Sequence, residues 1–342
     1  MQIYSDIQPF EKIVLYQEDF PIWYQLFCEH AKVFINMSDD EYEIEKITNP
    51  VLEEFIKINT GREPIPLKYH FDSVYDDNSK ILTTPRAAYF LDISKEYADK
   101  LQEYYGILVQ SSELIEDKIL SKTYYRNLPA NTSCNSENKI GWIKLLDIEK
   151  LPMNTLVISD NFLFSNEDGI RGFKNIIQLF EAIMPSNLST DFNILLIAQE
   201  HKNKDAAWCN KLSGDIKTAI NNLKKPYKIL FEIVFTETIH KRIAISNYFT
   251  ITPDKGFAIF RSDDLSIVHE DTEIQVDRVF HRINQNEGDT EYFNAEHSLN
   301  EIKKICEKVV EYISNRPNDK NFRIMGDCNP DKSIKNRLIN DV

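Results

Sequence analysis

Residues 155–159 read Thr155-Leu-Val-Ile-Ser159, residues 193–198 read Asn193-Ile-Leu-Leu-Ile-Ala198, and residues 228–235 read Lys228-Ile-Leu-Phe-Glu-Ile-Val-Phe235. Each is a short apolar run, which is typical of a strand buried on both faces of a sheet. Between the runs, apolar residues recur at helical spacing over 170–180 and 208–223. The order strand, helix, strand, helix, strand predicts parallel pairing with helices on the sheet faces, so we expect an α/β fold.

The N-terminal part of the chain shows a second, smaller α/β pattern. Residues 87–91 are typical of a buried strand, the next dozen residues of a helix, and residues 107–109 of another strand. Before them, apolar residues from Trp23 to Phe34 recur at three- and four-residue spacing and predict a helix, whereas the fold of 1–80 stays undetermined.

The domain boundaries follow from polar stretches. Residues 126–140 are polar and contain proline, so we expect a linker or long surface loop there. This places an N-terminal α/β region at 1–140 and a larger α/β domain at 150–314.

The end of the chain is more polar. Residues 263–296 hold ten acidic residues and two arginines and predict irregular surface structure. Ser298 with Glu301 has the pattern of a capping box that begins a final helix. The polar tail at 315–342 is expected to be loosely held.

Composition excludes several classes of protein. The 342 residues include 40 basic and 54 acidic side chains, and a net charge of −14 argues against binding nucleic acid or anionic membrane through the overall field. The nine glycines form no phosphate-binding loop or dinucleotide fingerprint, so no cofactor is expected. Five dispersed cysteines, no apparent signal peptide and no long apolar run predict a cytoplasmic protein without a transmembrane segment.

One short segment carries chemistry. In His240-Lys241-Arg242, His240 and Arg242 lie on the same side of an extended chain because side chains alternate, and Asn247 follows where the strand would turn. This resembles the H-x-K-x-x-x-x-D motif of the phospholipase D-like superfamily, with Arg for Lys and Asn for Asp. It is more similar to the variant in the C-terminal phospholipase D-like domain of MIT-domain proteins. The resemblance covers about 150–262 and implies a three-layer α/β sandwich.

The resemblance also implies a mechanism in which His240 attacks phosphorus and Arg242 holds the phosphoryl oxygens. Asn247 would orient the imidazole without supplying the negative charge of an aspartate, which disfavours turnover. Lys241, with Lys202 and Lys204 from a lysine-rich stretch at 201–228, would help to bind an anion or nucleic acid.

Active members of the superfamily need two motifs. The second match, His30-Ala31-Lys32, has Met37 where the acid should be and lies in the predicted helical stripe, so we interpret it as a coincidence. A complete site would therefore require a symmetric homodimer that pairs two copies of His240.

Three functions stay open from the sequence. The favoured one is a non-catalytic module that binds an anion or a protein partner. The composition of the chain is rich in Ile, Asn, Lys and Tyr, which suggests that the gene comes from an AT-rich bacterial genome. The module would then act in a bacterial multi-protein system, such as a defence system. The second is a metal-independent phosphodiesterase or nuclease that acts through His240. The third is a PIN-type metal-dependent nuclease, since Asp92 and Asp160 each follow a predicted strand.

Overall fold

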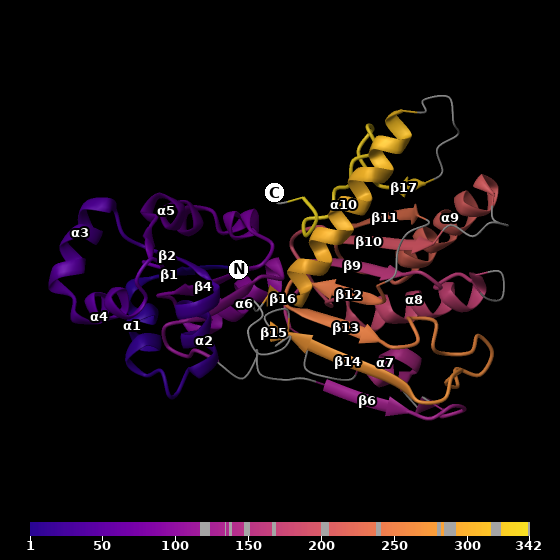
Figure 1. Ribbon diagram of the computed structural model, residues 1–342, viewed down its shortest axis with the longest axis horizontal. Helices are drawn as coiled ribbons and strands as arrows, with labels where there is room; N and C mark the ends of the chain where they lie inside the picture. The colour runs from indigo at the N-terminus through magenta and orange to yellow at the C-terminus, as the bar shows by residue number, and fades with distance from the viewer. Residues whose placement is uncertain are drawn as a thin grey trace. The chain divides into compact units, whose positions relative to one another are not determined.

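The computed structural model describes residues 1–116, 124–133, 135–136, 139–146, 151–165, 169–199, 205–236, 241–278, 282–283, 292–315 and 323–340. The chain divides into two compact units, Met1–Lys122 and Thr123–Asp341 (Figure 1). Both units are mixed α/β, as the sequence predicts. Each is described by itself.

Unit 1 is built on a parallel sheet with the strand order β3-β2-β1-β4-β5. Its strands are β1 (Gln2–Ser5), β2 (Lys32–Ile35), β3 (Ile65–Pro66), β4 (Ala87–Leu91) and β5 (Leu108–Ser111). Its helices are α1 (Ile7–Leu15), α2 (Pro21–Gln25), η1 (Leu26–His30), α3 (Asp39–Thr48), α4 (Pro50–Ile58), α5 (Lys68–Asp76), η2 (Asn78–Thr83) and α6 (Lys95–Tyr105). The strand order reverses between β1 and β4, so their carboxyl ends meet where open α/β sheets gather ligand-binding residues.

Unit 2 is built on a larger mixed sheet with the order β17-β11-β10-β9-β12-β13-β14-β6. Its strands are β6 (Tyr124–Leu128), β9 (Thr155–Asp160), β10 (Phe192–Gln199), β11 (Ile229–Thr236), β12 (Ile243–Ser246), β13 (Phe249–Pro253), β14 (Thr272–Arg278) and β17 (Ile324–Gly326). Two short pairs lie outside this sheet: β7 (Asn135–Ser136) with β8 (Lys139–Ile140), and β15 (Arg282–Ile283) with β16 (Tyr292–Phe293). Strands β9, β10 and β11 are parallel, and β12 returns antiparallel to β9.

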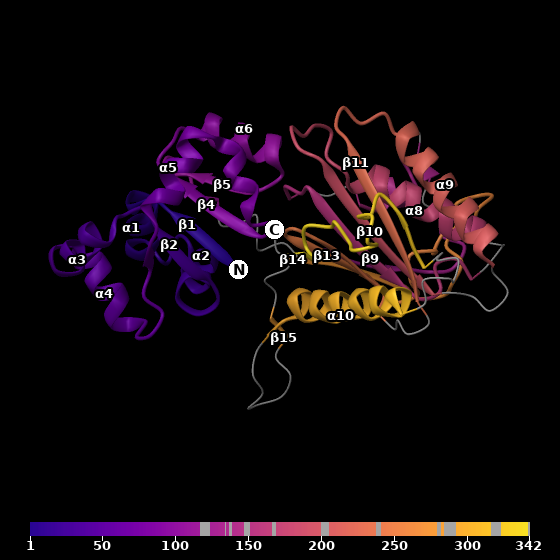
Figure 2. The same cartoon turned by 90° about the horizontal axis from the view of Figure 1, so that it is seen from above.

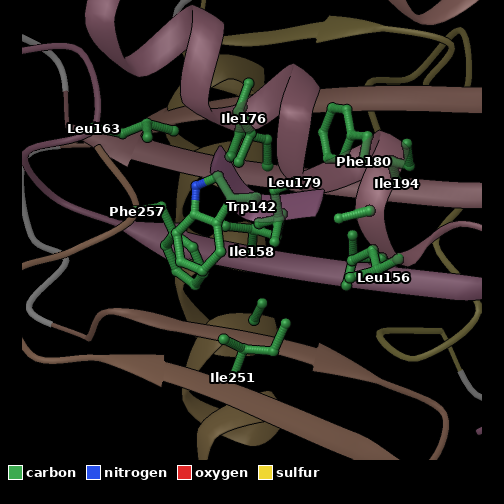
Figure 3. Packing of buried hydrophobic residues seen from close by; sticks show 14 of the residues in the cluster. Trp142, Leu156, Ile158, Leu163, Ile176, Leu179, Phe180, Ile194, Ile251 and Phe257 are labelled. Carbon is green, nitrogen blue, oxygen red and sulfur yellow. The ribbon is translucent and has the colours of Figure 1, made fainter. Parts of the chain in front are cut away.

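Helices cover both faces of the sheet of unit 2. They are α7 (Gly141–Leu145), α8 (Ile170–Ile183), α9 (Ala206–Asn222) and α10 (Asn294–Ser314). Figure 2 shows α8 and α9 on one face and α10 on the other. Beneath α8, Trp142 of α7 packs among Ile158, Ile176 and Leu179 (Figure 3), because these strands and helices present apolar side chains inward.

The three apolar runs that open the sequence analysis form β9, β10 and β11, so this prediction is confirmed. The helices predicted between them are α8 and α9. The predicted hairpin is also present, since β12 pairs antiparallel with β13.

Other expectations need correction. The helical stripe from Trp23 stops at His30, and Lys32 begins β2, so His30 and Lys32 are not a helical pair. Helix α10 begins at Asn294, which places Ser298 and Glu301 inside the helix rather than at a capping box. Within 263–296, residues Thr272–Arg278 form a strand whose alternate side chains are buried.

Two segments expected to be loose contribute to the sheet. Residues 124–128, which overlap the first three residues of the predicted linker at 126–140, form its edge strand β6. At the other edge, residues 324–326 form β17 against β11, and the segment continues to Asn340 along the same unit. A polar segment can be firmly held when its backbone groups find partners, which hydropathy does not reveal.

A candidate anion-binding pocket

A cavity of about 280 Å³ opens in unit 2 beyond the carboxyl end of β9. It is lined by Asp160, Phe162, Ser165, Arg171, Arg242, Lys255, Ala258 and His269. These residues come from the end of β9, the turn after it, the start of α8, the entry to β12, and the segments that follow β13. The sheet therefore assembles one concave site from residues up to 109 positions apart, counting from Asp160 to His269.

Strand register brings Asp160 and Arg242 together. Ser159 pairs with Ile243 across the antiparallel β9–β12 ladder, so the next pair outward is Asp160 with Arg242. The Ser159 hydroxyl also donates to the Lys241 carbonyl at 2.9 Å, which fixes the chain just before β12. Arg242 of the sequence motif and the strand-end Asp160 thus belong to the same site.

Asp160 lines the pocket and is held in place by backbone hydrogen bonds. Its side chain accepts hydrogen bonds from the backbone amides of Phe162 at 3.0 Å and Phe257 at 2.7 Å. Burial raises the pKa of the Asp160 carboxyl, although these two amides and Arg242 act in the opposite direction. Gly256 has a φ of +83°, and a Cβ there would lie 2.6 Å from Asp160 Oδ2, so only glycine fits against this carboxylate.

Three cations surround the cavity. Arg242 donates to the Asp254 carbonyl at 2.5 Å, and its guanidinium lies over the Phe162 ring at 5.3 Å from the centroid. Lys255 forms an ion pair with Asp254 at 3.0 Å. Arg171 differs from both, because its Nε is buried and has no hydrogen-bond partner in the described residues.

His269 completes the lining. Burial lowers the pKa of its imidazole, and the positive charges of Arg171 and Lys255 act in the same direction. Since an ordinary histidine has a pKa near 6.5, we expect the His269 ring to be mainly neutral at pH 7. A neutral imidazole can donate one hydrogen bond to a bound anion without adding charge.

Only some of the residues that the sequence singles out lie at the pocket. Arg242 lines the pocket, whereas His240 lies outside the described residues, as do Lys202 and Lys204. The Lys241 side chain points away from the pocket and toward α10. Its Nζ lies 2.6 Å from the Glu301 carboxylate and 3.1 Å from the Ser298 hydroxyl. Neighbouring side chains on an extended segment face opposite sides, which separates Lys241 from Arg242.

Asn247 lies at the other end of the hairpin. It is buried in the turn between β12 and β13, where its Oδ1 accepts from the backbone amides of Asn154 and Thr155. The four residues of β12 separate it from Arg242, so the two Cα atoms are five steps apart, a span of roughly 16 Å at about 3.3 Å per residue. The structure therefore brings Arg242 to the pocket and gives Asn247 different partners.

The two aspartates considered for metal binding lie in different units. Asp160 belongs to unit 2, while Asp92 follows β4 in unit 1 and accepts from the Ser112 hydroxyl at 2.6 Å. Beside Asp92, the buried Asp6 accepts from the Asp92 amide, the Asn36 amide group and the Tyr75 hydroxyl. No group of three or more His, Cys, Asp or Glu side chains is arranged for a metal ion in the described part of the chain.

The lysine-rich stretch is partly engaged in contacts. Lys217 pairs with Asp327, Lys228 with Asp191, and Lys225 donates to the carbonyls of Met184 and Pro185. Of the described lysines in this stretch, Lys211 and Lys224 are exposed and form no ion pair with a carboxylate in the part of the chain that the structure describes.

Sequence reasoning missed Arg171, Lys255 and His269 as members of a site. No local spacing links them, since Arg171 is the second residue of α8, whereas Lys255 and His269 lie 14 residues apart in the connection between β13 and β14. Asp6 was missed for a different reason: β1, which it follows, was not predicted.

A scan against models of known protein families finds no match for this chain. A comparison with curated proteins likewise finds no relative. None of the described helices is long and apolar enough to cross a membrane. Functional inference therefore rests on the geometry of the site.

Proposed function

We propose that unit 2 is a diverged phospholipase D-like module that binds a phosphate-bearing ligand in the pocket beyond β9. The observation that carries the proposal is Arg171, which lines the same cavity as Arg242 and Lys255 and whose buried Nε has no hydrogen-bond partner among the described residues. A buried donor without an acceptor is costly, and a phosphate oxygen would satisfy it. Guanidinium groups suit phosphate because they donate two parallel hydrogen bonds.

The phospholipase D-like part of the proposal is supported by the order of elements. Three parallel strands with intervening helices precede Arg242, and the β12–β13 hairpin follows it. Binding is favoured over turnover because Asn247 is engaged by the backbone of Asn154 and Thr155. Catalysis through His240, alone or across a homodimer, is the competing function.

The first prediction tests binding directly. Calorimetric titration of the full chain with inorganic phosphate should give saturable binding, and Arg171→Ala and Arg242→Ala should each weaken it at least tenfold, about 1.4 kcal/mol. Arg242→Lys should give an intermediate affinity, because lysine keeps the positive charge but lacks the two parallel N–H donors of the guanidinium group. Lys211→Ala is the matched control, since Lys211 is an exposed cation on α9 away from the pocket lining.

Unchanged affinity in both arginine variants, with circular dichroism confirming that they fold, would reject the pocket as the site. Catalysis is tested in the same samples with a bis-phosphodiester reporter, with and without chelator. Turnover that persists with chelator and is lost in His240→Ala would establish the phosphodiesterase instead. Turnover that is lost when chelator is added would point to metal chemistry. Sedimentation of the active sample would then show whether a dimer is required.

A further inference from the structure

One exposed aromatic side chain, Phe162, lines the cationic pocket. Among the described residues of unit 2, the exposed large apolar or aromatic side chains are Phe162, Ile170 and Tyr125, with exposed fractions of 49%, 51% and 52%. Phe162 lines the pocket, and Ile170 immediately precedes the pocket residue Arg171. Apolar surface next to a concave polar site is typical of a site whose ligand has both a charged part and an apolar or aromatic part.

Phe162 is held in a fixed position. Its backbone amide donates to Asp160 at 3.0 Å, and its carbonyl accepts from the Ser165 amide at 3.1 Å and the Ser165 hydroxyl at 2.8 Å. The Arg242 guanidinium lies over its ring. An exposed aromatic ring whose backbone is fastened at both the amide and the carbonyl is a preorganised stacking surface.

We infer that the ligand is a nucleotide whose phosphate lies between Arg171 and Arg242 and whose base stacks on Phe162. This inference rests on the proposed function and adds the class of ligand to it. Planar bases stack on aromatic rings and on guanidinium groups, and every base has a face for this contact. The ligand is a nucleoside monophosphate, either free or as the terminal nucleotide of a single strand.

The size of the pocket favours this ligand over a phospholipid. A cavity of about 280 Å³ lies just below the usual range for small-molecule sites, about 300–1,000 Å³, and suits a phosphate and a sugar, with the base outside against Phe162, better than long acyl chains.

The test compares ligands that differ by one part, using calorimetry on the full chain. Adenosine 5′-monophosphate should bind at least tenfold more tightly than ribose 5-phosphate. Phe162→Leu should remove this difference, because it should weaken binding of adenosine 5′-monophosphate more than binding of ribose 5-phosphate, and Phe162→Trp should restore it. Tyr125→Leu is the matched control, because Tyr125 is an equally exposed aromatic residue on β6 and does not line the pocket.

The outcomes separate this inference from the proposed function. Equal affinities for the two phosphates, both lost in Arg242→Ala, would overturn the nucleotide and leave the anion pocket standing. No binding of either phosphate would overturn both. Tighter binding of short-chain phosphatidic acid than of the nucleotide would also overturn the inference. A 5′-phosphorylated hexanucleotide that binds more tightly than the mononucleotide, in a Phe162-dependent way, would identify a strand end as the source.

Discussion

Asn247 shows how a motif residue can serve the fold. Its side chain is fully buried, accepts from two backbone amides and donates to the Asn154 Oδ1 at 3.1 Å. These bonds tie the β12–β13 turn to the start of β9, at the end of the sheet away from Arg242. The neutral amide suits this buried position because it both accepts from backbone amides and donates to Asn154, whereas a carboxylate has no proton to donate and is costly to bury.

The second prediction follows from this environment. Asn247→Asp should lower the free energy of unfolding at pH 7 by about 1–3 kcal/mol, because the buried group becomes charged. The loss should shrink at pH 5, where an acid with a raised pKa is protonated. Urea denaturation at both pH values measures it, with Asn210→Asp on the exposed face of α9 as the control.

An unaltered free energy of unfolding in Asn247→Asp would contradict the structural role. If the variant also gained phosphodiesterase activity, Asn247 would instead serve His240, as the sequence resemblance implies.

At the scale of elements, Glu232 connects β11 to the C-terminal segment. The carboxylate is 1% exposed and accepts from the backbone amides of Lys335 at 2.7 Å and Asn336 at 3.0 Å. Burial raises the pKa of Glu232 to about 7, and the two amides and the Lys335 charge only partly offset this effect. The other titratable groups that influence it or are influenced by it are Asp327, Cys306 and Cys328.

The third prediction gives the sign of the pH dependence. A carboxyl whose pKa is raised on folding stabilises the folded segment fully below its ordinary pKa of 4.5, and this contribution is lost as the pH rises through about 7. The free energy of opening of residues 324–340 should therefore fall between pH 5 and pH 7.5. At most, the equilibrium constant for opening should increase about tenfold for each pH unit.

Hydrogen exchange of 324–340, corrected for the intrinsic rate, measures this opening. Glu232→Gln should remove most of the pH dependence, because an amide does not titrate in this range. A wild-type protein with protection that rises with pH over the same interval would show that Glu232 does not control the segment.

At the scale of the whole molecule, the two units have separate apolar clusters. The cluster in unit 1 includes Tyr4, Tyr89 and Leu101, and the larger one in unit 2 includes Phe180, Leu179 and Ile194. In unit 1 the rings of Phe34, Tyr4 and Tyr89 stack across β2, β1 and β4, because the parallel register aligns them. Each unit therefore has its own source of hydrophobic stabilisation.

The fourth prediction uses a matched pair of substitutions. Leu101→Ala and Leu179→Ala should each cost about 2–5 kcal/mol of unfolding free energy, since both remove a buried leucine. The loss should be confined to the unit that carries the substitution. Urea denaturation followed by hydrogen exchange mass spectrometry, with peptides assigned to each unit, measures both. Equal destabilisation of the two units by either variant would show that they unfold as one.

Several parts of the fold could be predicted from the sequence because their signals are local. Strands β9, β10 and β11 are continuous apolar runs, and α8 and α9 carry their apolar residues at helical spacing. Both patterns follow from burial alone. The same reasoning found β4, α6 and β5 in unit 1, and it placed Asp160 after a strand and Arg242 on an extended segment before a hairpin.

Other features depended on tertiary structure. Strand β2 follows η1 after one residue, so its four residues continued an apparent helical stripe, and the polar segment at 323–340 is held by backbone hydrogen bonds that composition does not report. The pocket is the clearest case. Lys255 and His269, from the connection between β13 and β14, meet Asp160 and Arg171 only because β12 and β13 pair beside β9 in one register, and long-range register depends on how whole elements pack rather than on any local pattern.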